Sequence, residues 1–146
     1  MTRATPLRVE RLSEFKPSSK TVGLLTATRF DTKLRVALAK RGFTVLKYAS
    51  NKTIVSEGGG KEIAEIYKKA ESIYGLSLSC QIIDTCIGND SVKINATLEL
   101  ADMAKNEVIF VIERGGWTGP CGLEGNGKSV FDELAEAMAR EWENPK

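Results

Sequence analysis

Alternating apolar and polar positions in the second half of the chain predict an antiparallel meander. Residues 76–87 and 91–101 alternate in this way about a turn at Gly88, Asn89 and Asp90, and residues 107–114 supply a third strand. Side chains alternate between the faces of a strand, which gives the middle segment one apolar and one polar face. The apolar face comprises Val92, Ile94, Ala96, Leu98 and Leu100, and the polar face comprises Lys93, Asn95, Thr97 and Glu99. We expect one covered sheet face and one open face available for function.

Helical spacing of apolar residues predicts three helices. The first covers residues 31–41 and stops at Gly42, the second stops at Gly75, and the last is N-capped by Ser129 with Asp132 in the capping-box position. Their apolar stripes are Phe30, Leu34, Ala37 and Leu38; Ile63, Ile66, Tyr67, Ala70, Ile73 and Tyr74; and Phe131, Leu134, Ala135, Met138 and Trp142.

Short apolar runs between these helices complete the predicted fold. Residues 21–27 form a strand, and residues 43–49 and 52–57 form a hairpin. Residues 1–20 contain prolines, serines and scattered basic residues, which indicate an N-terminal arm or edge segment. The sequence therefore predicts a single α+β domain at residues 21–146, with an antiparallel sheet of about five strands covered by about three helices.

Composition removes several classes of function. The 146 residues, 42% of them hydrophobic, are typical of one globular domain. The absence of histidine excludes hydrolases that use Ser-His or Cys-His pairs. Cys80, Cys86 and Cys121 lack metal-site spacing, and we expect reduced thiols lying mostly in the core. No apolar run approaches the length of a membrane helix or a signal sequence, so we expect a cytoplasmic protein without membrane contact.

Charge is unevenly distributed along the chain. Residues 1–52 hold 12 basic and 3 acidic residues, a net charge of +9, whereas residues 53–146 carry −7. A basic face that meets polyanions would explain this segregation, with an acidic remainder that limits indiscriminate binding or faces another subunit. A chance distribution over a solvated surface is the alternative.

The segment from Gly122 to Ser129 matches the phosphate-binding pattern GxxxxGK[ST]. Its context is wrong, because such a loop joins a buried parallel strand directly to its helix, and too little chain follows for a parallel sheet. We interpret the segment as a loop followed by a helix N-cap. Asp84, Asp90 and Glu99 have no spacing that indicates paired acid-base catalysis, so we expect neither an enzyme nor a metal or other cofactor.

Single-stranded nucleic acid requires basic residues along a groove beside apolar or aromatic platforms. Residues 115–127 are expected to form a glycine-rich loop that holds Trp117. Tyr48 and Trp117 are candidates for base stacking because neither belongs to a periodic buried stripe, although Trp117 could instead plug the sheet edge. The predicted nucleic-acid-binding residues are Arg29, Lys33, Arg35, Lys40, Arg41, Lys47, Tyr48, Lys93, Arg114 and Trp117.

The chain from about residue 20 onward resembles the ThermoDBP family of archaeal single-stranded DNA-binding proteins. The resemblance rests on IYKKAESIYG ahead of LSLSCQII, on the meander, and on ERGGWTGPCG (residues 113–122) before an acidic terminal helix. It implies an α+β fold unrelated to the OB-fold, a cleft of exposed apolar side chains flanked by basic ones, and a homo-oligomer. We expect sequence-tolerant binding of single-stranded DNA or RNA by a dimer or tetramer that assembles through residues 131–142.

Two other functions remain open. A structural or regulatory module could dock an acidic protein on the same basic face. A duplex-DNA binder is the second alternative, because the segment 31–57 superficially resembles a winged helix, although it lacks the preceding helices on which such a domain packs.

Overall fold

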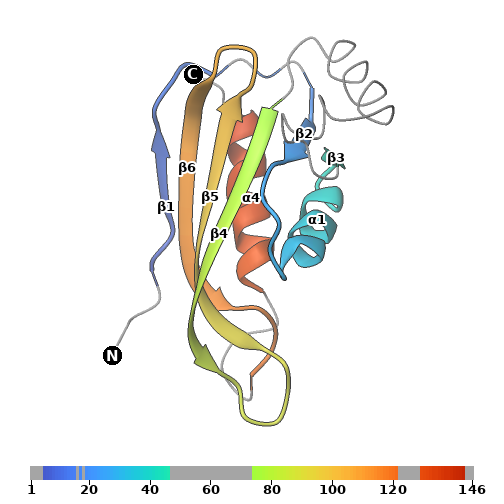
Figure 1. Ribbon diagram of the computed structural model, residues 1–146, viewed down its shortest axis with the longest axis vertical. Helices are drawn as coiled ribbons and strands as arrows, with labels where there is room; N and C mark the ends of the chain where they lie inside the picture. Colours follow the sequence, from blue (N-terminus) through green and yellow to red (C-terminus); the bar gives the residue numbers. More distant parts are fainter. Residues whose placement is uncertain (1–4, 16, 18, 47–73, 122–128, 144–146) are drawn as a thin grey trace.

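A computed structural model describes residues 5–15, 17, 19–46, 74–121 and 129–143. These residues form a six-stranded sheet in the order β1-β6-β5-β4-β2-β3, with both described helices on one face (Figure 1). The elements, in chain order, are β1 (Arg8–Arg11), β2 (Thr21–Leu24), α1 (Asp31–Ala39), β3 (Thr44–Leu46), β4 (Tyr74–Thr85), β5 (Val92–Asp102), β6 (Glu107–Trp117) and α4 (Val130–Glu143).

The sheet is mixed rather than antiparallel, which corrects that part of the predicted fold. Strands β4, β5, β6 and β1 pair antiparallel, whereas β2 runs parallel to both β3 and β4. The crossover through α1 explains the parallel pairing of β2 and β3, because it returns the chain to the end of the sheet where β2 began. The α+β class is confirmed.

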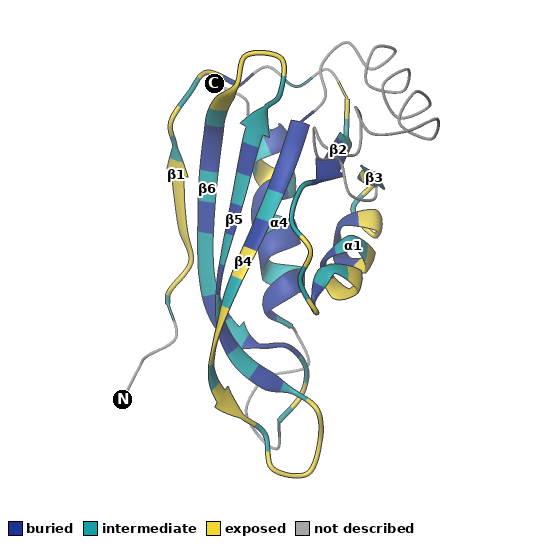
Figure 2. Ribbon diagram, in the orientation of Figure 1, coloured by how far each residue is buried: buried dark blue, intermediate teal, exposed yellow. Residues whose placement is uncertain are grey.

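The long meander follows its hydrophobic pattern. In β5, the residues from Val92 to Leu100 alternate between buried and half-buried positions, as predicted (Figure 2), and the buried ones belong to the same core cluster as the buried residues of the helices. Helix α4 buries the predicted stripe against this side of the sheet. Ser129 caps α4 as predicted, since its hydroxyl accepts a hydrogen bond from the Asp132 N–H at 3.2 Å while its own N–H donates to the Asp132 carboxylate at 3.3 Å.

Trp142 organises an aromatic cluster at one end of the core. Its ring lies edge-on to Phe15 at 4.8 Å and to Phe43 at 4.9 Å, and its Nε1–H donates to the Ser19 carbonyl at 2.9 Å. Phe15 is 1% exposed, so part of the segment predicted to be an arm or edge lies in the core. The same segment also supplies β1, an edge strand.

Two boundaries differ from the sequence predictions. Tyr74 and Gly75 belong to β4 rather than to the end of a helix; Gly75 packs so closely on Leu25 and Met103 that a Cβ there would lie 2.6 Å from both side chains. Trp117 is the last residue of β6 and not part of a glycine-rich loop. The rest of the second predicted helix and the segment 52–57 of the predicted hairpin lie outside the described residues.

The cysteines correct another prediction. Cys86 and Cys121 form a disulfide across a sequence separation of 35 residues, so they are not reduced thiols. Cys80 is free and half-buried on β4. Burial, with a contribution from Asp31, raises the pKa of its thiol to about 11.

Candidate nucleic-acid interface

A row of cations lies along α1 and the residues just before it. Lys33 and Lys40 are seven residues apart, which places them on one side of the helix, whereas Arg29 lies two residues before its first residue; all three are exposed. We call these three residues the basic stripe. Helix α1 is oriented by Leu34, Ala37 and Leu38, which are buried on its other side. It ends at Gly42, whose φ of +87° is the left-handed conformation that glycine adopts without strain.

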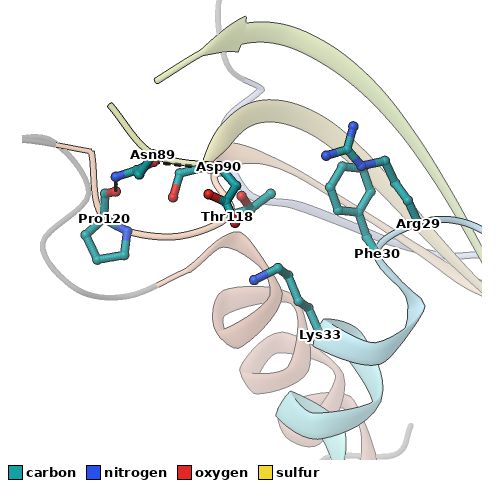
Figure 3. A pocket seen from close by; sticks show the side chains of 8 residues that line it. Arg29, Phe30, Lys33, Asn89, Asp90, Thr118 and Pro120 are labelled. Carbon is teal, nitrogen blue, oxygen red and sulfur yellow. Dashed lines mark hydrogen bonds between the residues drawn. The ribbon is translucent and has the colours of Figure 1, made fainter. Parts of the chain in front are cut away.

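Two adjoining pockets follow the basic stripe. The first, of about 390 Å³, is lined by Arg29 and Lys33 on one side and by Asn89, Ser91 and the segment after β6 on the other (Figure 3). The second, of about 240 Å³, lies between α1 and the start of α4 and includes Lys40. Lys33 and Thr118 line both pockets, so the pockets adjoin, and we call the two together the groove.

The far wall of the first pocket is cross-linked. The Cys86–Cys121 disulfide joins the β4–β5 turn to the segment after β6, and the Asn89 side-chain amide donates to the Pro120 carbonyl at 3.0 Å (Figure 3). Within the turn, the Ser91 N–H donates to Asn89 Oδ1 at 2.8 Å. These links hold the wall in place opposite Arg29 and Lys33.

Polar groups in the groove suit an anionic ligand. The Arg29 guanidinium lies 5.0 Å from the centroid of the buried Phe30 ring, which orients it beside the pocket. The groove also contains Asp90 and Asp132, and Asp132 already accepts a hydrogen bond in the α4 cap. Three cations against these two carboxylates leave the groove net positive.

Several predicted binding residues lie away from the groove or are held in ion pairs. Arg114 faces the helices and pairs with Glu133 at 2.7 Å, and Arg41 pairs with Glu136 at 3.8 Å. Arg35 follows Lys33 by two residues, which places it on a different side of α1. The structure thus brings together Arg29, Lys33 and Lys40 but not these three arginines.

Lys93 and Trp117 belong to the opposite face of the sheet. They are register partners on β5 and β6, one position out of phase with Ile94, which faces the helices. The Lys93 ammonium lies 5.8 Å from the Trp117 ring centroid, and Trp117 is 8% exposed. Trp117 is therefore a packed strand residue, which corrects its expected place in a loop, and the groove does not include it.

Lys47 and Tyr48 lie outside the described residues. Among the residues that are described, every aromatic side chain is buried, so none offers an exposed ring to a base. The exposed apolar surface along the basic stripe comes instead from Val36, which is 50% exposed between Lys33 and Lys40. Four further residues line the groove but were not among the predicted binding residues, because turn and loop residues carry no periodic signal: Asn89, Ser91, Thr118 and Pro120.

Part of the uneven charge is satisfied inside the protein. Arg11 pairs with Glu141 at 2.9 Å, and Arg41 with Glu136, so carboxylates of α4 pair with two cations of the basic half of the chain. These acidic residues therefore form ion pairs within the chain. The basic stripe makes none of these pairs and lines the groove.

Three other features considered in the sequence are the GxxxxGK[ST] match, a metal site and a membrane-spanning helix. Residues 122–128 of the GxxxxGK[ST] match lie outside the described residues, and the Ser129 hydroxyl is engaged in the α4 cap. Within the described ranges, no cluster of His, Cys, Asp or Glu could hold a metal ion. The two described helices are also too short and too polar to cross a membrane.

Comparisons with known proteins assign no family. No family model and no curated protein matches the chain. Among solved structures, the PelC dodecamer from Paraburkholderia phytofirmans matches with a TM-score of 0.47 at 14% identity, covering 93% of this chain and 94% of that one. A minor lipoprotein from Acinetobacter baumannii matches at 0.36 and 14%, covering 84% and 91%. Lipoprotein GNA1162 from Neisseria meningitidis matches at 0.38 and 9%, covering 83% and 96%. Likenesses at this level assign no function.

Proposed function

We propose that the protein binds single-stranded nucleic acid, without marked sequence preference, along the groove beside α1. The observation that supports this proposal most is the row of exposed cations Arg29, Lys33 and Lys40 along the groove. Lys33 and Lys40 are separated by about 10 Å at 1.5 Å per residue of helix, and Arg29 extends the row before the start of α1. An extended polyanion can contact several cations over that distance, whereas a small anion would contact one or two.

Weak sequence preference follows from the types of side chain in the groove. Lysine and arginine heads contact phosphates, which are the same in every sequence. Val36 offers an apolar surface that any base or sugar can contact. Because the described groove has no exposed aromatic ring, we expect affinity to depend mainly on charge and to fall steeply with salt.

The similarity of the sequence to ThermoDBP proteins agrees with this proposal and remains part of it. A basic docking face for an acidic protein is the alternative, and the lack of an exposed aromatic ring in the described groove favours it. Binding of labelled single strands at physiological salt separates the two only when it exceeds binding of another polyanion such as heparin, because any basic face attracts polyanions at low salt.

The direct test compares two lysines. Lys33→Gln removes the cation shared by both pockets, whereas Lys105→Gln removes an exposed cation from the β5–β6 turn, outside the groove. Fluorescence anisotropy with single-stranded DNA, single-stranded RNA and duplex DNA should show weaker single-strand binding for Lys33→Gln alone. Equal loss in both variants would show that only overall charge matters, and equal binding of duplex would contradict single-strand selectivity.

The disulfide bears on the proposed location. Disulfides persist in oxidising compartments and, inside cells, chiefly in hyperthermophilic archaea and bacteria. The archaeal family that the sequence resembles fits the second case, so we retain a cytoplasmic location in the proposal. Alkylation of free thiols in freshly lysed source cells should leave Cys86 and Cys121 unmodified, and their alkylation would contradict an oxidised pair in the cell.

We also propose that the protein forms a homo-oligomer, which would place several basic stripes along one strand. Residues 131–142 were expected to form the interface, but Phe131, Met138 and Trp142 are buried in the protomer. The apolar side of α4 is therefore used in the core, so an interface would not be formed by these three side chains.

A further inference from the structure

Strand β1 leaves one edge of the sheet open. It pairs with β6 on one side, and no described strand pairs with its other side. Figure 2 shows β1 as exposed along most of its length. Val9 is 41% exposed and the preceding Leu7 38%, so the edge presents apolar side chains as well as backbone groups. Open edges of this kind pair readily with another strand.

The pairing with β6 determines which backbone groups point outward. The Leu12 N–H donates to the Ile109 carbonyl at 2.8 Å, which sets the phase of the antiparallel ladder. Alternate residues bond the neighbouring strand, so Arg8 and Glu10 direct their backbone groups to β6. Val9, between them, directs its N–H and carbonyl away from the sheet.

We propose that a second copy of this chain pairs antiparallel with β1 about a two-fold axis at Val9. The two Val9 residues then exchange both backbone hydrogen bonds. Arg8 of each chain lies directly opposite Glu10 of the partner subunit, and the contact is self-complementary, as a two-fold interface requires. The two sheets become one continuous sheet.

Charge complementarity selects this register over its neighbours. An axis at Arg8 would place two arginines opposite each other, and an axis at Glu10 would place two carboxylates opposite each other. An axis at Leu7 would place Arg8 opposite Pro6 and Glu10 opposite Ala4. An axis at Arg11 would place Arg8 opposite Glu14, but it would also place two arginines opposite each other and Glu10 opposite Leu12. Only the axis at Val9 pairs both charges with opposite charges.

The length of the contact indicates a modest affinity. Within residues 7–11 only Leu7, Val9 and Arg11 direct backbone groups outward, so few backbone hydrogen bonds cross the contact. The contact would be one interface of the oligomer proposed above. It does not depend on nucleic-acid binding, because β1 is one edge strand of the sheet and α1 packs near β3, the other edge strand (Figure 1). Mass measurements therefore test it without reference to the groove.

Charge reversal tests the register. Sedimentation velocity at increasing micromolar concentrations should show the wild-type mass rising from 16.0 kDa toward twice that value. Arg8→Glu and Glu10→Arg should each raise the dissociation constant at least about tenfold, because like charges then lie opposite each other. An equimolar mixture of the two variants should dimerise again, since each supplies the charge that the other lacks.

The mixture distinguishes a lost interface from a damaged protomer. Arg8 faces Glu113 within the chain, so Arg8→Glu could weaken β1 itself, whereas Glu10 faces Val111. A misfolded variant would not recover in the mixture, and far-UV circular dichroism reports folding separately. A wild type that stays at 16.0 kDa throughout, single variants that dimerise as the wild type does, or a mixture of folded variants that stays monomeric would each overturn the proposal.

Discussion

Reducing the Cys86–Cys121 disulfide is expected to lower the free energy of unfolding by up to about 4 kcal/mol. The bond closes a loop with a sequence separation of 35 residues, and opening it gives the unfolded chain more conformations. The entropy lost on closing such a loop corresponds to about 4 kcal/mol at 25 °C in the chain-entropy model. With a urea dependence of about 1.5 kcal/mol per M, the unfolding midpoint should fall by about 2 to 3 M.

Urea unfolding, followed by tryptophan fluorescence with and without a phosphine reductant, measures this change. A thiol titration confirms reduction, because the protein should show one reactive thiol when denatured before reduction and three after it. The Cys86→Ser/Cys121→Ser double variant is the control, and reductant should not shift its midpoint. A fully reduced wild type with an unchanged midpoint would refute the chain-entropy argument for this bond.

Four further predictions concern three single residues. Cys80 should react slowly with iodoacetamide at pH 8, because burial and Asp31 raise its pKa to about 11, and labelling as fast as in urea would contradict this. Because the pKa of Cys80 is higher in the folded than in the unfolded state, its contribution to the free energy of unfolding should be constant below about pH 9 and be lost as the pH rises from 9 to about 11. Ser129→Ala should cost about 1 kcal/mol in chemical denaturation because it removes the α4 cap, whereas no loss would show that the cap contributes nothing. Trp142→Ala should cost about 3 to 5 kcal/mol because it empties the centre of the aromatic cluster, and a thermal midpoint close to that of the wild type would place the tryptophan outside the core.

Elements with strong periodicity could be predicted from sequence. The alternation from Val92 to Leu100 and the stripe from Phe131 to Trp142 each report one buried side, and the structure buries both. The Ser129 cap was predictable because capping is local. These features depend only on residues close together in the chain.

Features that depend on distant partners could not be predicted. Hydrophobic pattern does not identify a strand's neighbour, so the parallel pairing of β2 with β3 and β4 carried no signal. Cys86 and Cys121 meet only because the antiparallel pairing of β5 with β6 brings the two ends together. Tyr74 continued an apparently helical stripe, but its environment in the sheet overrides that local preference.

The candidate site could be predicted from the sequence only in part. Lys33 and Lys40 fall on the basic side of the predicted helix, and the structure places both along the groove, whereas Arg41 from the same predicted side pairs with Glu136. The separation of Lys93 and Trp117 from that stripe depends on which face each strand position takes, and one residue of register reverses it. The ion pairs of Arg41 and Arg114 depend on where α4 docks.

The salt dependence of single-strand binding tests the central claim most directly. Each cation that neutralises a phosphate adds about −0.7 to the slope of log affinity against log salt, so three cations contribute about −2. Replacing Arg29, Lys33 and Lys40 together by glutamine should therefore make the slope shallower by about 2, with the fold retained by circular dichroism. An unchanged slope in the folded triple variant would contradict binding along the groove beside α1.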